Sequence, residues 1–263
     1  MLSNRDGAAN KRSRLRIKPL RNPGQSLDEE LDKLVNDQAF TYVWSAACLV
    51  LLALYEWVAY LLDIPRQPGL FSICAAVAIG VLAIKFPKLR RRARAIRLGR
   101  DGERLVGQLL ESLRADGAIV LHDIPGHGFN VDHLVVSDRG VLVVETKTLS
   151  KPTSNARISF AGDQILYDGK KPRRDPIRQV RAQAKWIADL LAESTGRRFP
   201  VRSAVLFPQW WVEPAPESIR KDVWVLEPKA LPAFLKNEPR RLASEDVNLI
   251  ASRLKSYVES HTG

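Results

Sequence analysis

Three residues on two neighbouring segments of the chain have the types and spacing for metal-assisted chemistry. Two valine-rich segments joined by four turn-forming residues predict a β-hairpin that carries Asp132, Glu145 and Lys147. If Val136 pairs with Val141, Asp132 lies directly opposite Glu145, with Cβ atoms ~4.5–5.5 Å apart. Lys147 is two residues beyond Glu145 and shares its face of the sheet. Unless a bulge shifts this register, two carboxylates and one ammonium group lie side by side.

Two like charges at opposed strand positions destabilise a sheet, so something has to offset their repulsion. Lys147 could neutralise one of the acids as a structural ion pair. Alternatively, a divalent cation could bridge both carboxylates, because hard metal ions prefer oxygen ligands. The spacing alone leaves both interpretations open.

The aspartate and the Glu-Thr-Lys triplet resemble the D…ExK signature of the PD-(D/E)xK nuclease superfamily. The surrounding sequence resembles a narrower family, the nuclease-related domain or NERD family, in four blocks that occur in the right order over residues 99–210. The blocks are Gly99-Arg100-Asp101-Gly102-Glu103, Val131-Asp132-His133-Leu134-Val135-Val136, Gly140-Val141-Leu142-Val143-Val144-Glu145-Thr146-Lys147 and Asp175-Pro176-Ile177-Arg178-Gln179.

The resemblance implies a restriction-endonuclease-like fold and a role for each matched residue. Asp132 and Glu145 would hold Mg²⁺ (or Mn²⁺), and Glu103 would assist the metal from the first helix of the domain. Lys147 would position or activate the attacking water and stabilise charge on the phosphate. Gln179 would point into the site from a long helix. The implied activity is metal-dependent hydrolysis of a phosphodiester bond.

Two of these positions also have plainer interpretations. Glu103 could lie on a solvated helix face, and only the matching block gives it a role at the site. Gln179 and Gln183, four residues apart, could both be surface residues of their helix.

A run of basic residues adjoins Gln179 in the sequence. It consists of Lys170, Lys171, Arg173, Arg174, Arg178, Arg181 and Lys185. Such a run could follow the phosphate backbone of DNA or RNA, or it could simply form a solvated face. We weigh the two interpretations equally.

Histidines and tryptophans offer further alternatives. His122, His127 and His133 raise the possibility of a zinc site. We favour solvated histidines, because His133 is expected on the strand face opposite the carboxylates and His127 lies in a glycine-rich loop. Trp210 and Trp211 could stack on bases, but burial of both against the sheet is the favoured interpretation.

The elements that position these residues follow from hydrophobic periodicity and from turn and capping signals. Helices are expected over residues 99–115, 175–196 and 245–260, and strands over 118–122, 131–136, 141–147, 157–160, 164–167, 201–207 and 223–226. This order predicts an α/β domain with a mixed sheet flanked by helices.

Composition and charge exclude several classes of protein. The chain has 263 residues, of which 45% are hydrophobic and 27% charged, so it is neither disordered throughout nor collagen-like. Its two cysteines, Cys48 and Cys74, exclude a disulfide scaffold. The formal net charge is +12, and 16 basic against 8 acidic residues lie before residue 99. Much of the excess positive charge therefore flanks two apolar stretches, which favours membrane topology over nucleic acid as its explanation.

The two apolar stretches, residues 40–62 and 69–86, are predicted to be transmembrane helices. The first would span ~35 Å and the second ~27 Å, close to the ~30 Å hydrocarbon core. Glu56 is the single charge of the first stretch, and we expect it to snorkel towards the membrane surface. A buried hairpin of a soluble bundle is the alternative, but neither stretch has a polar face.

Basic residues flank this hairpin on one side only. Residues 1–39 are expected to form a disordered basic arm, with a short helix possible from Ser26 to Asp37. Residues 87–98 are expected to form a basic juxtamembrane linker that could also bind anionic lipids. The protein is expected in the inner (cytoplasmic) membrane of the cell. By the positive-inside rule, both termini and the domain of residues 99–263 face the cytoplasm.

These features favour a membrane-tethered, Mg²⁺-dependent nuclease that acts on DNA or RNA. A non-catalytic nucleic-acid-binding module on the same fold is one alternative. A membrane-anchored protein-interaction module that uses the fold as a scaffold is another.

Overall fold

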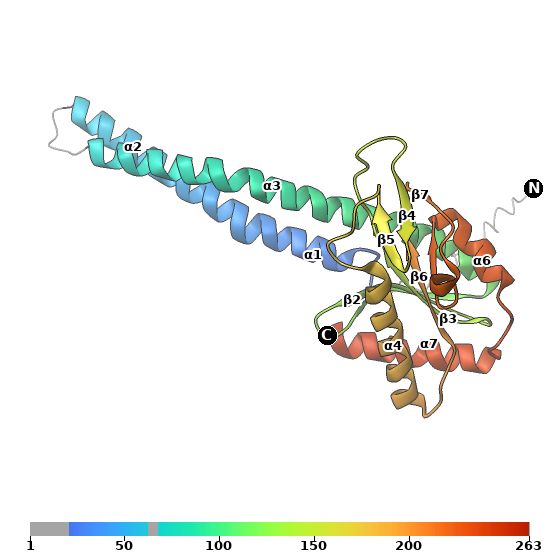
Figure 1. The fold of residues 1–263 in the computed structure, drawn as a ribbon. Helices are drawn as coiled ribbons and strands as arrows, with labels where there is room; N and C mark the ends of the chain where they lie inside the picture. Colours follow the sequence, from blue (N-terminus) through green and yellow to red (C-terminus); the bar gives the residue numbers. More distant parts are fainter. Residues whose placement is uncertain (1–20, 63–67, 263) are drawn as a thin grey trace, which may run out of the picture.

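A five-stranded mixed sheet lies at the centre of the C-terminal part of the chain in a computed structural model, which describes residues 21–62 and 68–262 (Figure 1). The strands, in spatial order, are β1 (Ile119–Pro125), β2 (Asn130–Ser137), β3 (Gly140–Thr146), β6 (Val201–Leu206) and β8 (Val223–Leu226). The first three are antiparallel, whereas β3, β6 and β8 run parallel. The predicted α/β architecture with a mixed sheet is confirmed.

Helices cover both faces of this sheet, because its strands are apolar on both sides. One face packs against α4 (Pro176–Thr195) and α7 (Ser244–Thr262). The other packs against the end of α3 (Pro68–Ser112), the short helix η2 (Leu113–Asp116) and α6 (Leu231–Asn237). Alternation along β3 follows this division, since Val143 faces the first layer and Leu142 and Val144 face the second.

A second sheet of three strands lies beside the first. Its order is β5 (Gln164–Tyr167), β4 (Arg157–Ala161) and β7 (Trp211–Val212). The expected hairpin of β4 and β5 is confirmed, and Gly162 takes a positive φ of 58° in its turn. The short helices α5 (Glu217–Arg220) and η3 (Pro228–Ala230) complete this part of the chain.

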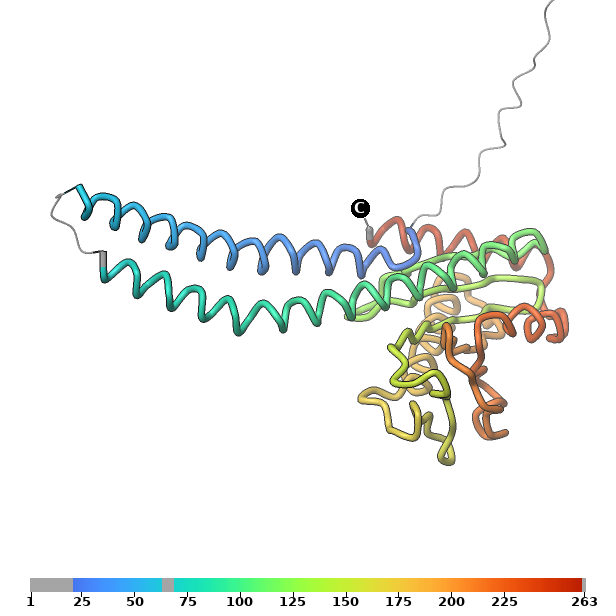
Figure 2. The backbone as a smooth tube through the Cα atoms, turned by 90° about the horizontal axis from the view of Figure 1, so that it is seen from above, coloured from blue at the N-terminus to red at the C-terminus, as the bar shows by residue number. Residues whose placement is uncertain are grey.

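A helical hairpin extends away from the α/β domain, as Figures 1 and 2 both show. Its first arm consists of α1 (Gln25–Lys33), the π-helical segment η1 (Leu34–Phe40) and α2 (Thr41–Leu61), and its second arm is α3. Two helices, Gln25–Leu61 and Gly69–Asp116, are long and apolar enough to cross a membrane. Large apolar side chains of α2 and of the first half of α3 are exposed along the hairpin.

The segment expected as a linker, residues 87–98, is helical. The helix expected from Gly99 begins instead at Pro68 and continues for 45 residues through Pro87. Most residues from 88 to 98 are good helix formers, and apolar residues recur among them at intervals of three or four positions. The resulting stripe of Leu89, Ala93 and Ile96 packs against α1. This contact, which the sequence does not reveal, stabilises the helix across the predicted break.

The N-terminal arm is also more ordered than predicted. Residues 1–20 lie outside the described part of the chain, but residues 25–40 are helical rather than disordered. Leu31 and Leu34 are buried against Ile96 of α3. The short helix expected from Ser26 therefore exists, although it begins at Gln25 and Gly24 precedes it as the capping residue. The link expected between the two spans falls mostly within residues 63–67, outside the described residues.

Candidate active site

The β2–β3 hairpin has the predicted register. Val136 pairs with Val141, and the ladder continues to His133 opposite Val144. Beyond that pair, the backbone N–H of Thr146 donates a hydrogen bond of 2.7 Å to Oδ2 of Asp132. The strands therefore bring Asp132 and Glu145 to the same end of the hairpin, where the carboxylate of Asp132 takes over a position of the backbone ladder.

Glu145 is the centre of a network of polar side chains. Its side chain is buried, with 2% of the residue exposed, and Lys147 donates to its Oε1 through Nζ. Gln179 donates to Oε1 and Gln183 to Oε2, each over 2.7 Å. Nζ of Lys147 also donates to Oε1 of Gln179 over 3.0 Å. A buried carboxylate needs such donors, since its charge has no water to replace them.

Helix α4 supplies both glutamines of this network. The expected cap is confirmed: the carboxylate of Asp175 accepts from the N–H of Ile177 over 2.9 Å, and Pro176 follows at the first helical position. Residues 179 and 183 are one turn apart and share a helix face. The surface interpretation of Gln183 is wrong, because this residue is buried and bonds to Glu145. The four-residue spacing from Gln179 was the signal that could have identified it.

Glu103 approaches the same carboxylates from α3. Only 9% of it is exposed, so it does not lie on a solvated helix face. Burial, followed by the charges of Asp123 and Glu145, raises its pKa from 4.5 to about 8. Burial and the charges of Glu145 and Glu103 likewise hold the pKa of Asp132 well above its usual range. Glu145 is thus close enough to Glu103 and Asp132 for its charge to raise the pKa of both.

The repulsion between Asp132 and Glu145 could be offset by an ion pair with Lys147 or by a metal ion, and the contacts in the structure bear on this choice. The Lys147–Glu145 ion pair exists, whereas no ion pair among the described residues includes Asp132 or Glu103. Within the described residues, no three His, Cys, Asp or Glu side chains converge as a ready-made metal cluster. Mg²⁺ needs only one or two carboxylates, with water and phosphate oxygens as its other ligands. Beside Glu145, Oε1 of Gln183 is a buried oxygen with no hydrogen-bond donor. This set of oxygens therefore fits a hard divalent cation.

Sequence reasoning missed one further buried acid, Asp123 of β1. Only 1% of it is exposed, and its charge acts on Glu103. Its carboxylate accepts from Arg21, Ser26 and Asn130. Arg21 and Ser26 are about a hundred residues away in the sequence, so no local pattern could have indicated this site.

All seven basic residues of the candidate nucleic-acid surface are exposed. Lys170, Lys171, Arg173 and Arg174 lie between β5 and α4, and Arg178 and Lys185 lie on α4. Arg181 differs from the others because its guanidinium binds the carboxylate of Asp222 over 2.7 and 3.1 Å. The residues of the loop before α4 are therefore better placed than Arg181 to meet a phosphate.

The expectations for histidine and tryptophan are each correct in part. His127 is exposed as expected, but His122 and His133 are buried with their Nδ1 atoms 2.9 Å apart. They pair across β1 and β2, where burial lowers the pKa of both rings. Trp210 is buried as expected, and its indole N–H donates to the carbonyl of Leu149 over 3.1 Å. Trp211 is 65% exposed, because it lies on the outer edge strand β7.

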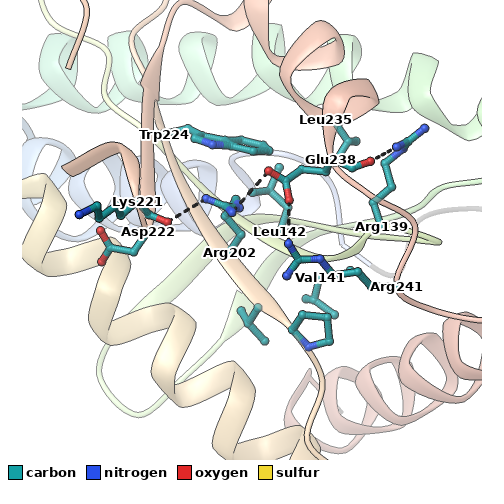
Figure 3. Close-up of a pocket in the computed structure, with 13 residues that line it drawn as sticks. Arg139, Val141, Leu142, Arg202, Lys221, Asp222, Trp224, Leu235, Glu238 and Arg241 are labelled. Atoms are coloured by element: carbon teal, nitrogen blue, oxygen red, sulfur yellow. Dashed lines mark hydrogen bonds and ion pairs between the residues drawn. The ribbon is translucent and has the colours of Figure 1, made fainter. Parts of the chain in front are cut away.

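A separate cavity of about 170 Å³ lies at the opposite ends of β3 and β6 (Figure 3). Arg139, Arg202 and Arg241 line it, but all three bind Glu238, through its side chain or its backbone carbonyl. The guanidinium of Arg202 also lies 5.0 Å from the ring centroid of Trp224. None of the residues predicted to be catalytic lines this cavity.

Comparison with known proteins agrees with the position of the polar network. No curated protein and no solved structure matches the chain. The family model described as the nuclease-related domain, NERD, matches residues 98–208, which is less than half of the chain. This segment contains Glu103, Asp132, Glu145, Lys147 and Gln179. The part of the chain that builds the candidate site thus matches the nuclease-related domain family.

Proposed function

We propose that this protein is a membrane-tethered nuclease that hydrolyses phosphodiester bonds of nucleic acid on the cytoplasmic side of the membrane, with Mg²⁺ or Mn²⁺. The observation that carries the proposal is the contact of Lys147 and Gln179 with Glu145, next to Asp132, within a segment that matches the nuclease-related domain. The mixed sheet and its flanking helices support a restriction-endonuclease-like fold and a place in the PD-(D/E)xK superfamily.

The oxygens of Asp132, Glu145 and Glu103 would hold the metal ion, which supplies a Lewis acid for the phosphate and lowers the pKa of a bound water. Lys147 has two acceptors that orient its ammonium group, Glu145 and Gln179, while 26% of its side chain stays accessible. It can thus orient the attacking water and stabilise negative charge on the phosphate. Gln179 donates to Glu145 and accepts from Lys147, so it fixes the distance between the carboxylate of Glu145 and the ammonium group of Lys147.

The decisive experiment measures cleavage of labelled DNA and RNA by the full chain in detergent, with Mg²⁺, with Mn²⁺ and with chelator. We expect metal-dependent cleavage, which Glu145→Gln abolishes and Lys147→Met lowers by about 10²-fold or more. Glu259→Gln, on the exposed side of α7, is the matched control and should cleave like the wild type. If the wild type binds nucleic acid without cleaving it under any of these conditions, the non-catalytic binding module replaces the nuclease.

The proposed path of the nucleic acid follows the exposed basic loop before α4. Each phosphate contact should contribute about −0.7 to −0.9 to the slope of log K against log salt concentration. Arg173→Glu combined with Arg174→Glu should therefore weaken binding and flatten the slope, measured by fluorescence anisotropy in chelator. Arg253→Glu, on exposed α7, is the control. An unchanged affinity and slope in the double variant would refute this path.

Membrane attachment is supported by the exposed side chains of the helical hairpin. α2 would span ~31 Å, close to the hydrocarbon thickness of a bilayer. Tyr42 and Lys85 meet at one end of the span over 3.0 Å, and Trp57 binds Ser72 near the other over 2.8 Å. Such aromatic and basic residues are typical of membrane interfaces. The exposed basic residues 88–97 then favour anionic lipids on the cytoplasmic side.

A further inference from the structure

The cavity at the first residues of β3 and β6 has more basic than acidic side chains in its lining (Figure 3). The basic side chains are Arg139, Arg202, Lys221 and Arg241, and the acidic ones are Asp222 and Glu238. The carboxylate of Asp222 is already bound by Arg181, over 2.7 and 3.1 Å. Glu238 therefore supplies the carboxylate that the arginines of this cavity share.

Two guanidinium groups share this carboxylate, and neither contact is close. Oε1 of Glu238 lies 3.4 Å from Nη2 of Arg202, and Oε2 lies 3.5 Å from Nη2 of Arg241. Hydrogen bonds between charged N–H donors and carboxylates are usually shorter, about 2.7–2.9 Å. Within the described residues, these two arginines form no other ion pair. Two positive charges thus face a single negative charge at distances that leave room for a better acceptor.

Other parts of the fold hold both arginines in place. The guanidinium of Arg202 lies 5.0 Å from the ring centroid of Trp224, and its Nη1 donates to the carbonyl of Lys221 over 3.2 Å. The backbone N–H of Arg241 donates to the carbonyl of Asp138, in the turn between β2 and β3, over 2.7 Å. An arginine that is already held in place loses less side-chain freedom when it binds an oxyanion.

The side chain of Glu238 can leave these arginines without unfolding a helix or a strand. The residue directly follows α6, and 20% of its side chain is exposed. Its backbone carbonyl accepts from Arg139, and this contact does not involve the carboxylate. A rotation of the side chain alone would therefore free Arg202 and Arg241 for an oxyanion from outside.

We propose that this cavity binds a phosphate group, with Glu238 as an internal competitor for the same two arginines. A phosphate dianion has one negative charge and at least one oxygen more than a carboxylate, so it can accept from both guanidinium groups at once. The cavity volume of about 170 Å³ is below the roughly 300–1,000 Å³ of pockets that enclose drug-sized molecules. The ligand is therefore inorganic phosphate or the phosphate end of a small molecule.

This site is separate from the candidate active site. The two ends of β3, a strand of seven residues, are about 20 Å apart, and the candidate active site lies at the other end. The proposal therefore does not rest on the proposed nuclease function, and it can be tested without nucleic acid and without a divalent metal ion.

The test is isothermal titration calorimetry of the full chain in non-ionic detergent and chelator, with inorganic phosphate and with glycerol 3-phosphate. Potassium chloride at equal ionic strength is the blank. Arg202→Gln should weaken phosphate binding about tenfold or more, the scale of one hydrogen bond to a charged group. Glu238→Gln should strengthen it about tenfold, because the neutral amide no longer competes for the arginines. Such a gain cannot come from a misfolded variant.

Arg173→Gln combined with Arg174→Gln is the matched control, because these exposed arginines before α4 could also attract phosphate. This double variant should keep the wild-type affinity. Thermal melts give a second measurement: phosphate should raise the Tm of the wild type, and more so that of Glu238→Gln, but not that of Arg202→Gln.

The two probes distinguish the sources of the phosphate group. Tighter binding of glycerol 3-phosphate would support the phosphate end of a small molecule, and tighter binding of inorganic phosphate would support the free ion. The proposal would be overturned if neither probe bound to the wild type or to Glu238→Gln, or if Glu238→Gln bound phosphate more weakly than the wild type. The arginines would then only fasten the segment after α6 to the sheet.

Discussion

The four acids of the site differ in what surrounds each carboxylate. Glu145 accepts from three side chains, and Asp123 accepts from an arginine, an amide side chain and a backbone N–H. Asp132 has a single backbone donor among the described residues, the N–H of Thr146. Burial without enough donors favours the protonated form of a carboxyl group, which is why the pKa is raised at Asp132 and Glu103. These two positions are therefore the ones that gain most from a bound cation.

Stability should depend on pH through Glu103. The unfolded chain loses this proton near pH 4.5, whereas the folded protein retains it up to about pH 8. Between these values the folded state binds more protons, so the free energy of unfolding falls as the pH rises from 4.5 to about 8. We expect the Tm of the metal-free wild type to fall across this range, by roughly 2–4 °C for each kcal/mol of stability lost. The Tm of Glu103→Gln should fall less over the same range.

The measurement is a series of thermal melts of the full chain in detergent from acidic to mildly alkaline pH. Glu259→Gln, an exposed carboxylate of α7, should follow the wild type. Parallel pH curves for wild type and Glu103→Gln would show that Glu103 titrates alike in the folded and unfolded states.

Residues of the site could be predicted where the signal was local. The placement of Asp132 and Glu145 at the same end of the hairpin followed from the turn between β2 and β3, because a tight turn fixes the register of a hairpin. Asp123 could not be predicted, since Arg21 and Ser26 reach it only through the packing of α1 on α3. The buried state of His133 also needed tertiary contacts, because it depends on the facing ring of His122.

At the scale of elements, α3 connects the hairpin to the site. The sequence analysis divides it into an apolar span that ends at residue 86, a basic linker over residues 87–98 and a helix from residue 99. The structure keeps one helix because its stripe of apolar residues packs on α1. The β-strands and α4 were predicted more closely, since their patterns and the Asp175-Pro176 cap lie within each element.

The approach of α3 to the end of β3 depends on Gly102. A Cβ at this position would lie 2.7 Å from Cβ and 2.9 Å from Cγ2 of Thr148, which follows Lys147. Gly102→Ala should therefore push α3 away from the site, lower the Tm and reduce cleavage. Gly80→Ala is the matched control in the same helix, because no atom lies within 4 Å of its Cβ.

Alanine at position 80 should stabilise α3 slightly, by up to about 1 kcal/mol in an exposed helix interior. Thr148→Gly should restore part of the Tm and of the cleavage rate that Gly102→Ala loses, since it removes the atoms that the new Cβ would meet. Thermal melts and cleavage rates of Gly102→Ala, Gly80→Ala and the Gly102→Ala, Thr148→Gly double variant check this. A Gly102→Ala variant as stable and active as the wild type would disprove a close contact between α3 and the segment after β3.

At the scale of the whole molecule, the hairpin has two unlike ends. α1 and the α/β domain lie together at one end, and the last turn of α2 and the first turn of α3 lie at the other (Figures 1 and 2). The exposed basic residues of α3 lie on the side of the domain. Membrane insertion would thus place residues 21–40 and the candidate site on the same side of the bilayer.

This arrangement predicts the topology. Because positively charged flanks are retained in the cytoplasm, a reporter that functions only in the cytoplasm should be active when it is fused after Gly263. The same reporter inserted near Gln67 should be inactive, and one that requires export should give the opposite pattern. Replacement of Arg90, Arg91 and Arg94 by Gln should weaken this preference, whereas the same change at Arg253 on α7 should not, because only charges near a span direct its insertion. A protein found in the soluble fraction, or an exported C-terminus, would show that the hairpin is covered by a protein partner or oriented the other way.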